Sequence, residues 1–221
     1  VYVFGTLGLF GYHALYFSAL RLAPAAEAGL IAYLWPLMIV LFSGLLPGET
    51  LRKGHVMGAS LGFLGAALII TGGGAGFSTQ HLPGYALAVL CALTWSGYSN
   101  LSRRLGDVPT ASVAVFCIAS AMLSFPLHLL LEDTILPSTT LGWAAIVGLG
   151  LGPVGLAFYV WDIGVKQGDI QLLGTASYAA PLLSTLLLVI MGVAVPSYML
   201  FWAALLITGG AIIAARASYS G

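Results

Sequence analysis

The sequence predicts an all-helical membrane protein that crosses the bilayer many times. Of its 221 residues, 60% are apolar and only 6% are charged, whereas a soluble domain carries about 25% charged residues. The apolar residues fall in runs close to the roughly 20 residues that an α-helix needs to cross a bilayer. The 29 glycines fit the same class, because small residues let helices pack closely in lipid.

Eight segments are long and apolar enough to span. They cover residues 1–20, 28–46, 56–72, 84–102, 111–131, 142–164, 172–193 and 197–215. Short connections carry nearly all the charge, and none is long enough to form a soluble domain. Strands are not expected, because no segment shows the alternating pattern of a membrane barrel.

The basic residues predict the orientation of these helices. When the connections are assigned alternately to the two sides, one side holds Arg52, Lys53, Arg103, Arg104, Lys166 and Arg216. The other side holds only Arg21. Cytoplasmic loops carry an excess of Lys and Arg, so we expect the six-residue side, with the C-terminus, to face the cytoplasm.

The chain also matches itself at a shift of 145 residues. Tyr33 then falls on Tyr178, Pro36 on Pro181, and Arg21 on Lys166. The last pair lies on opposite sides of the membrane, so the two copies have opposite orientations. Chance similarity among apolar helices is the alternative. The match predicts an inverted repeat, an architecture of secondary transporters that places the substrate site between the two halves.

The two halves are unequal. Residues 1–75 hold the last three helices of the first repeat, and residues 84–216 hold a second repeat of five. Equal halves would need two more helices before Val1, so we expect a protein of ten helices that forms one membrane domain.

Aromatic residues and a histidine mark the first segment as a cavity wall. Tyr12 and Tyr16 are four residues apart and share one helical face, and His13 begins the neighbouring face. Ionisable residues within the membrane favour a functional interpretation. The alternative is a neutral histidine that bonds to a tyrosine or to a backbone carbonyl.

Two prolines, Pro36 and Pro181, fall in the middle of spanning segments. Each leaves a backbone carbonyl without its helical partner, which is tolerated in a membrane where the backbone lines a cavity or meets a neighbour. We therefore expect hinges or binding elements here, with simple packing kinks as the alternative. The neighbouring side chains expected to line the cavity are Tyr33, Trp35, Ser177 and Tyr178.

The second half supplies further candidates. Trp95, Tyr98 and Ser99 share one helical face, and Trp161 lies in a later segment. These four are expected to line the cavity, although tryptophan and tyrosine also belong to the belt at the membrane surface.

Other sites are not expected. Asp162 and Lys166 have the spacing of a structural ion pair, and Cys91 and Cys117 lie in apolar segments as packing residues. No cofactor, metal, nucleic acid or enzymatic activity is predicted. No Lys or Arg lies at the centre of a segment, which argues against phosphorylated substrates. The absence of a central acid favours facilitated movement over proton coupling.

A family resemblance follows from the order of several motifs. Arg21, Ala25, Ala26, Pro36 and Gly48-Glu49 are followed by Trp95 and Arg103-Arg104. This order resembles the EamA type of the drug/metabolite transporter superfamily, and the aromatic residues resemble those of its YddG-type exporters of aromatic amino acids and paraquat. The resemblance implies two inverted five-helix repeats in a bacterial inner membrane, with both termini cytoplasmic. Glu49 departs from the repeat, because it falls on Ala194.

Taken together, these features predict a monomeric transporter that works by alternating access. The expected substrate is an aromatic or other bulky neutral amino acid, which enters a cavity lined by aromatic rings. An exporter of planar organic cations with the same fold is the first alternative. A membrane protein without transport activity, either a scaffold or an intramembrane enzyme, is the second.

Overall fold

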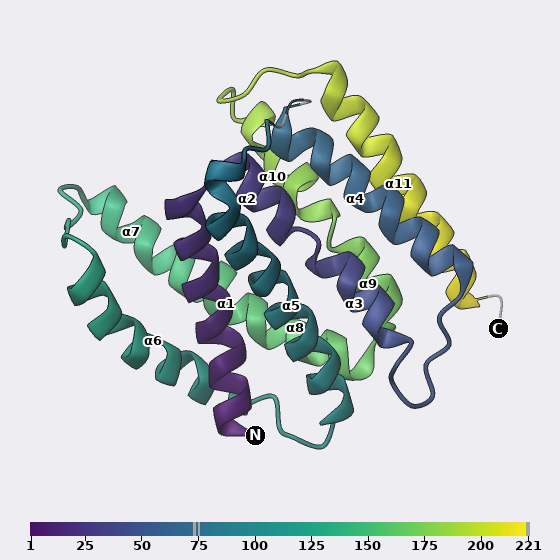
Figure 1. Ribbon diagram of the computed structural model, residues 1–221, viewed down its shortest axis with the longest axis horizontal. Helices are drawn as coiled ribbons and strands as arrows, with labels where there is room; N and C mark the ends of the chain where they lie inside the picture. The colour runs from purple at the N-terminus through teal and green to yellow at the C-terminus, as the bar shows by residue number, and fades with distance from the viewer. Residues whose placement is uncertain (73, 75, 220–221) are drawn as a thin grey trace.

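The computed structural model describes residues 1–72, 74 and 76–219, and these residues form helices and their connections without strands (Figure 1). The α-helices are α1 (Tyr2–Leu22), α2 (Ala25–Ala32), α3 (Trp35–Ser43), α4 (Lys53–Thr71), α5 (Leu82–Arg104), α6 (Ser112–Leu131), α7 (Thr140–Leu149), α8 (Ala157–Gln167), α9 (Ile170–Ala176), α10 (Ala179–Ile190) and α11 (Tyr198–Tyr219). A 3-10 turn, η1 (Thr79–His81), precedes α5, and a π-helical segment, η2 (Gly150–Leu156), joins α7 to α8.

Seven helical segments in the described part of the chain are long and apolar enough to cross a membrane. The segment expected at 84–102 forms α5, which has spanning length but is not among these seven. Its polar residues explain this difference, because Ser96, Ser99 and Asn100 lower its mean hydropathy; all three are buried. The sequence was therefore right about the helix and wrong about how apolar it is.

Both proline-containing segments are broken. The first is divided at Tyr33–Leu34 between α2 and α3, and the second at Ser177–Tyr178 between α9 and α10. When α2, α3 and α4 are shifted by 145 residues, their bounds fall within three residues of those of α9, α10 and α11. The internal match thus recurs in the element boundaries, while the ten-helix architecture remains a prediction.

Helices α4 and α11 lie side by side along one edge of the bundle (Figure 1). Their contact depends on two glycines that face each other. A Cβ added at Gly58 would collide with the carbonyl oxygen of Gly210, and a Cβ at Gly210 would collide with that of Gly58. Close approach of two backbones requires such small residues in lipid.

At the opposite edge lie α6, which packs against α1, and α7 (Figure 1). The glycine-rich run between Gly148 and Gly155 does not pack against another helix, since a Cβ at Gly148, Gly150 or Gly152 would meet open space. Within the described residues, these three glycines therefore make no close contact with a neighbouring helix. The run instead forms η2, which contains Pro153, and π-segments are a recognised form of helix interruption.

Candidate functional site

Aromatic rings from α1, α3, α5 and α8 meet around Trp95. Distances between ring centroids, measured from Trp95, are 5.2 Å to Tyr12, 5.3 Å to Tyr98, 5.4 Å to Phe158, 5.9 Å to Trp161 and 6.4 Å to Trp35. We call these six residues the aromatic cluster. The separations are those of interacting aromatic pairs, so rings that are far apart in the sequence form one contiguous surface.

One hydrogen bond fixes the orientation of a ring in the aromatic cluster. The indole Nε1 of Trp161 donates to Ser99 Oγ at 3.1 Å, and its ring lies edge-on to Trp35 with centroids 5.4 Å apart. Ser99, Trp95 and Tyr98 are all buried. The structure thus brings together Tyr12, Trp35, Trp95, Tyr98, Ser99 and Trp161, although it does not test whether they bind a substrate.

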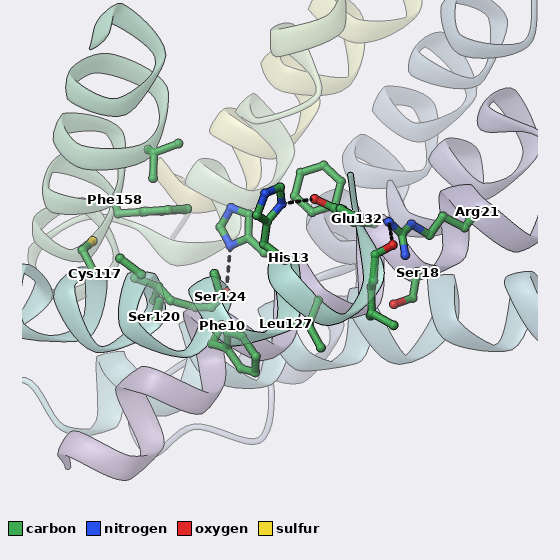
Figure 2. A pocket seen from close by; sticks show the side chains of 17 residues that line it. Phe10, His13, Ser18, Arg21, Cys117, Ser120, Ser124, Leu127, Glu132 and Phe158 are labelled. Carbon is green, nitrogen blue, oxygen red and sulfur yellow. Dashed lines mark hydrogen bonds and ion pairs between the residues drawn. The ribbon is translucent and has the colours of Figure 1, made fainter. Parts of the chain in front are cut away.

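A cavity of about 580 Å³ lies beside the aromatic cluster, between α1 and α6 (Figure 2). Its lining residues are Leu9, Phe10, His13, Ala14, Phe17, Ser18, Arg21, Cys117, Ser120, Ala121, Ser124, Leu127, His128, Leu131, Glu132, Val154 and Phe158. This volume is within the range of small-molecule sites. We call it the α1–α6 cavity.

His13 and Phe158 connect the α1–α6 cavity to the aromatic cluster. Their ring centroids are 5.6 Å apart, and Phe158 also contacts Trp95. His13 Nδ1 lies 2.8 Å from the carbonyl oxygen of Leu9. The two interpretations of this histidine therefore coexist, because it makes a backbone hydrogen bond and also lines a cavity.

Charged residues meet at one end of the α1–α6 cavity (Figure 2). Arg21 pairs with Glu132 at 2.9 Å, and His128 Nδ1 lies 2.7 Å from the same carboxylate. The hydrogen bond to His128 and the nearby charge of Arg21 lower the pKa of Glu132 below its ordinary value. About half of the Arg21 and Glu132 side chains is exposed, so water weakens this pair.

Sequence reasoning missed most of this cavity wall. No role was predicted for His128 or Glu132, although their spacing of four residues puts them on one helical face. Ser120 and Ser124 have the same spacing, and the Ser120 hydroxyl is buried without a hydrogen-bond partner. These pairs were the available signal that one face of α6 borders a cavity.

The residues at the helix breaks occupy a separate place. Tyr178 is fully buried, and its hydroxyl accepts a hydrogen bond from the backbone N–H of Leu37 at 3.0 Å. Pro36 is also buried, and Ser177 Oγ donates to the carbonyl of Leu173. None of these three predicted residues lines the α1–α6 cavity. Their contacts are those that hold a broken helix together.

Of the remaining predicted residues, Tyr16 and Tyr33 each contact one ring of the aromatic cluster. Tyr16 stacks on Tyr12 with centroids 6.2 Å apart, and Tyr33 is 6.5 Å from Trp35. Pro181 is half-buried in the first turn of α10. Among all the predicted binding residues, only His13 lines the α1–α6 cavity.

Two buried carboxylates have defined partners. Asp162 accepts hydrogen bonds from Lys166 and from Thr110, each at 2.7 Å, which confirms the predicted ion pair. Glu27 was placed in a connection by the sequence, but it lies buried in the first turn of α2 and accepts a hydrogen bond from Tyr85. Its partner is 58 residues away in the chain, so local pattern gave no sign of this contact.

Comparison with known proteins identifies the family. Residues 1–71 and 82–216 match the EamA-like transporter family. The aromatic amino acid exporter YddG of Ancylobacter novellus is 57% identical over 216 residues, which cover 97% of this chain and 75% of that protein. The protein of the same name from Escherichia coli K12 is 23% identical over 197 residues, covering 86% of this chain and 66% of that protein.

A solved crystal structure has the same fold. It shares 57% sequence identity with this chain and superposes with a TM-score of 0.94. The match covers 97% of this chain and 77% of the chain in that structure. The family match, the relatives and the spanning helices agree, so the chain belongs to the EamA-like transporter family and is a multi-pass membrane transporter.

Proposed function

We propose that this protein transports aromatic and other bulky neutral amino acids through a cavity between its two halves. The observation that carries the proposal is the aromatic cluster around Trp95, which reaches the α1–α6 cavity through Phe158 and His13. The name of the relative that is 57% identical supports the same substrate class.

The side chain of such a substrate would stack against aromatic rings. Each ring contact is worth about 0.5–1.5 kcal/mol beyond the burial of area, and the rings of Tyr12, Tyr16, Trp35 and Trp161 come from three different helices. Polar groups of the substrate would be met by His13, by tyrosine hydroxyls and by backbone groups near the helix breaks. We assign Tyr33, Pro36, Ser177, Tyr178 and Pro181 to these breaks.

We expect the movement that accompanies transport to occur at the two helix breaks. Each broken helix has two short arms that meet at a non-helical pair of residues, and the two breaks are packed together through the Tyr178–Leu37 hydrogen bond. We infer that rocking of the halves about these breaks opens the site to the two sides in turn. The distribution of Lys and Arg supports a cytoplasmic C-terminus, and the bacterial relatives support a place in the inner membrane.

Flux into liposomes containing the purified protein tests this proposal. Tryptophan, phenylalanine and paraquat should be compared, with and without a pH gradient, against protein-free liposomes. We expect saturable flux of both amino acids without a gradient. Flux of paraquat alone would favour the cation exporter, and no flux of tryptophan or phenylalanine would reject the proposed substrate class.

A further inference from the structure

A polar network joins three connections on the side of the molecule that is expected to be cytoplasmic. We call this side the loop side. Arg103, in the last turn of α5, donates from Nε to Glu49 in the loop after α3 at 2.7 Å, and its Nη2 pairs with the same carboxylate. Arg103 Nη1 also donates to the carbonyls of Val165 and Gly168, both at 2.7 Å. Gln171 at the start of α9 donates to the second carboxylate oxygen of Glu49 at 3.1 Å.

This network borders a second cavity, of about 350 Å³, which is polar. It is lined by Gly48, Glu49, Thr50, Arg52, His55, Arg103, Gly168, Asp169, Gln171, Ala217 and Ser218. The side chains of Arg103 and Glu49 are only 22% and 16% exposed, far less than those of Arg21 and Glu132 at the α1–α6 cavity, at 45% and 47%. Charges at the loop side are therefore less screened by water than the charges at the other cavity.

One face of α5 connects the aromatic cluster to this network. Trp95, Ser99 and Arg103 are spaced by four residues, so they lie along the same helical face. The rise of an α-helix places Arg103 about 12 Å beyond Trp95. Along this face from Trp95, the Trp161–Ser99 hydrogen bond comes first and the Arg103–Glu49 pair next.

The aromatic cluster itself holds no charged side chain. An amino acid stacked there finds no oppositely charged side chain within the cluster for its ammonium or its carboxylate. The Arg103–Glu49 pair has the complementary charges, but each is now satisfied by the other. The acid of this pair has no counterpart in the second repeat, because the position equivalent to Glu49 is Ala194.

We propose that Glu49 and Arg103 form a loop-side subsite for the α-amino acid zwitterion, which the protein's own ion pair fills in this structure. Separating the pair leaves two poorly solvated charges, which is costly unless both are compensated. A zwitterion compensates both, because its carboxylate takes the hydrogen bonds of Arg103 and its ammonium donates to Glu49. An anion satisfies Arg103 only, and a cation satisfies Glu49 only. The inference rests on the proposed function, since it concerns the path of the same substrate.

Selectivity of the unmodified protein gives the first test. Liposome flux should be measured for tryptophan, for tryptamine, which lacks the carboxylate, and for indole-3-propionate, which lacks the ammonium. We expect tryptophan to exceed both by about tenfold or more, the factor that corresponds to loss of one charge-assisted hydrogen bond. Equal fluxes of the three compounds would overturn the subsite, and this arm does not depend on the folding of any variant.

Two variants give the second test. Glu49→Gln leaves Arg103 as the remaining charge of the pair, so the flux of indole-3-propionate relative to tryptophan should rise. Arg103→Gln leaves Glu49, so the relative flux of tryptamine should rise. A mere structural tie between loops would change all three fluxes by the same factor, and that result would overturn the proposal.

Arg104→Gln and Asp107→Asn are the controls, because these two charged residues are exposed and line neither cavity. We expect both to keep the wild-type ratios of the three fluxes. If the controls shift the ratios as the loop-side variants do, general surface charge sets the selectivity and the subsite is rejected. Absence of tryptophan flux in the unmodified protein would instead reject the proposed function, so the two failures are distinguishable.

Discussion

The hydroxyl oxygen of Tyr178 lies 3.0 Å from the backbone nitrogen of Leu37 and accepts its hydrogen bond. Tyr178 stands at the break between α9 and α10, and Leu37 lies just after the break between α2 and α3. One broken helix therefore supplies the hydrogen-bond acceptor that the other lacks. This contact explains how a spanning helix can be interrupted without leaving a free donor in the membrane.

Tyr178→Phe should destabilise the protein without changing its shape. The N–H of Leu37 would lose its acceptor in a buried environment, which costs about 1–3 kcal/mol. Thermal unfolding in detergent should show a clear decrease in Tm. Tyr159→Phe is the matched control, because Tyr159 lies on an exposed face of α8, and its Tm should remain that of the wild type. Equal Tm values for both variants would contradict the bridging role of Tyr178.

Gly58→Val should separate α4 from α11. The added side chain would enter the space taken by the carbonyl of Gly210, and overpacking of this kind costs about 1–3 kcal/mol or more. We expect a lower Tm and less folded protein after purification. Gly209→Ala, one position away from the contact and facing open space, should lose nothing. A Gly58→Val protein as stable as the wild type would show that the two helices do not need this close approach.

Lys166→Met should be more harmful than the simultaneous change of both partners. Asp162 is 3% exposed, so removal of Lys166 leaves a buried carboxylate with only the Thr110 hydroxyl, at a cost of roughly 3–5 kcal/mol. The double variant Asp162→Asn/Lys166→Met removes that charge and should recover much of the loss. Thermal unfolding of the two variants measures this difference. A double variant less stable than Lys166→Met would contradict a structural ion pair.

The contact between α1 and α6 should weaken in acid. The pKa of Glu132 lies below its ordinary value of 4.5 because of the hydrogen bond to His128 and the charge of Arg21. A lowered folded-state pKa gives a contribution that is present above the ordinary value and is lost as the pH falls through the lowered value. The Tm difference between wild type and Glu132→Gln should therefore be seen at neutral pH and should vanish in acid. A difference that is unchanged in acid would contradict this assignment.

Much of the fold follows from local pattern. Spanning lengths and prolines predicted the helices and both breaks, because hydropathy and the missing proline N–H act within one segment. The Asp162–Lys166 pair was predictable for the same reason, since i, i+4 spacing brings the two side chains together. The aromatic residues of α1, α3, α5 and α8 were also recognised, because rings at such positions are unusual in a helix that faces only lipid.

Other features depend on contacts between distant segments. Glu27 and Tyr85 meet only after α2 and α5 pack, and the polar residues Ser96, Ser99 and Asn100 of α5 become buried only in the packed bundle. The α1–α6 cavity was missed because Ser120 and Ser124 interrupt an otherwise apolar helix only weakly. The hydrogen bond from the backbone N–H of Leu37 to the Tyr178 hydroxyl joins residues 141 positions apart, so it could not be predicted from local pattern.

The central claim is that the aromatic cluster recognises an amino acid side chain. The most direct measurement is the initial rate of tryptophan flux into liposomes for wild type, Trp35→Ala and Trp161→Ala, with Trp202→Ala, an exposed residue of α11, as the control. Loss of one or two ring contacts predicts a decrease of about tenfold for the first two variants and an unchanged rate for the control. Folded variants at Trp35 and Trp161 that carry tryptophan at the wild-type rate would contradict the claim.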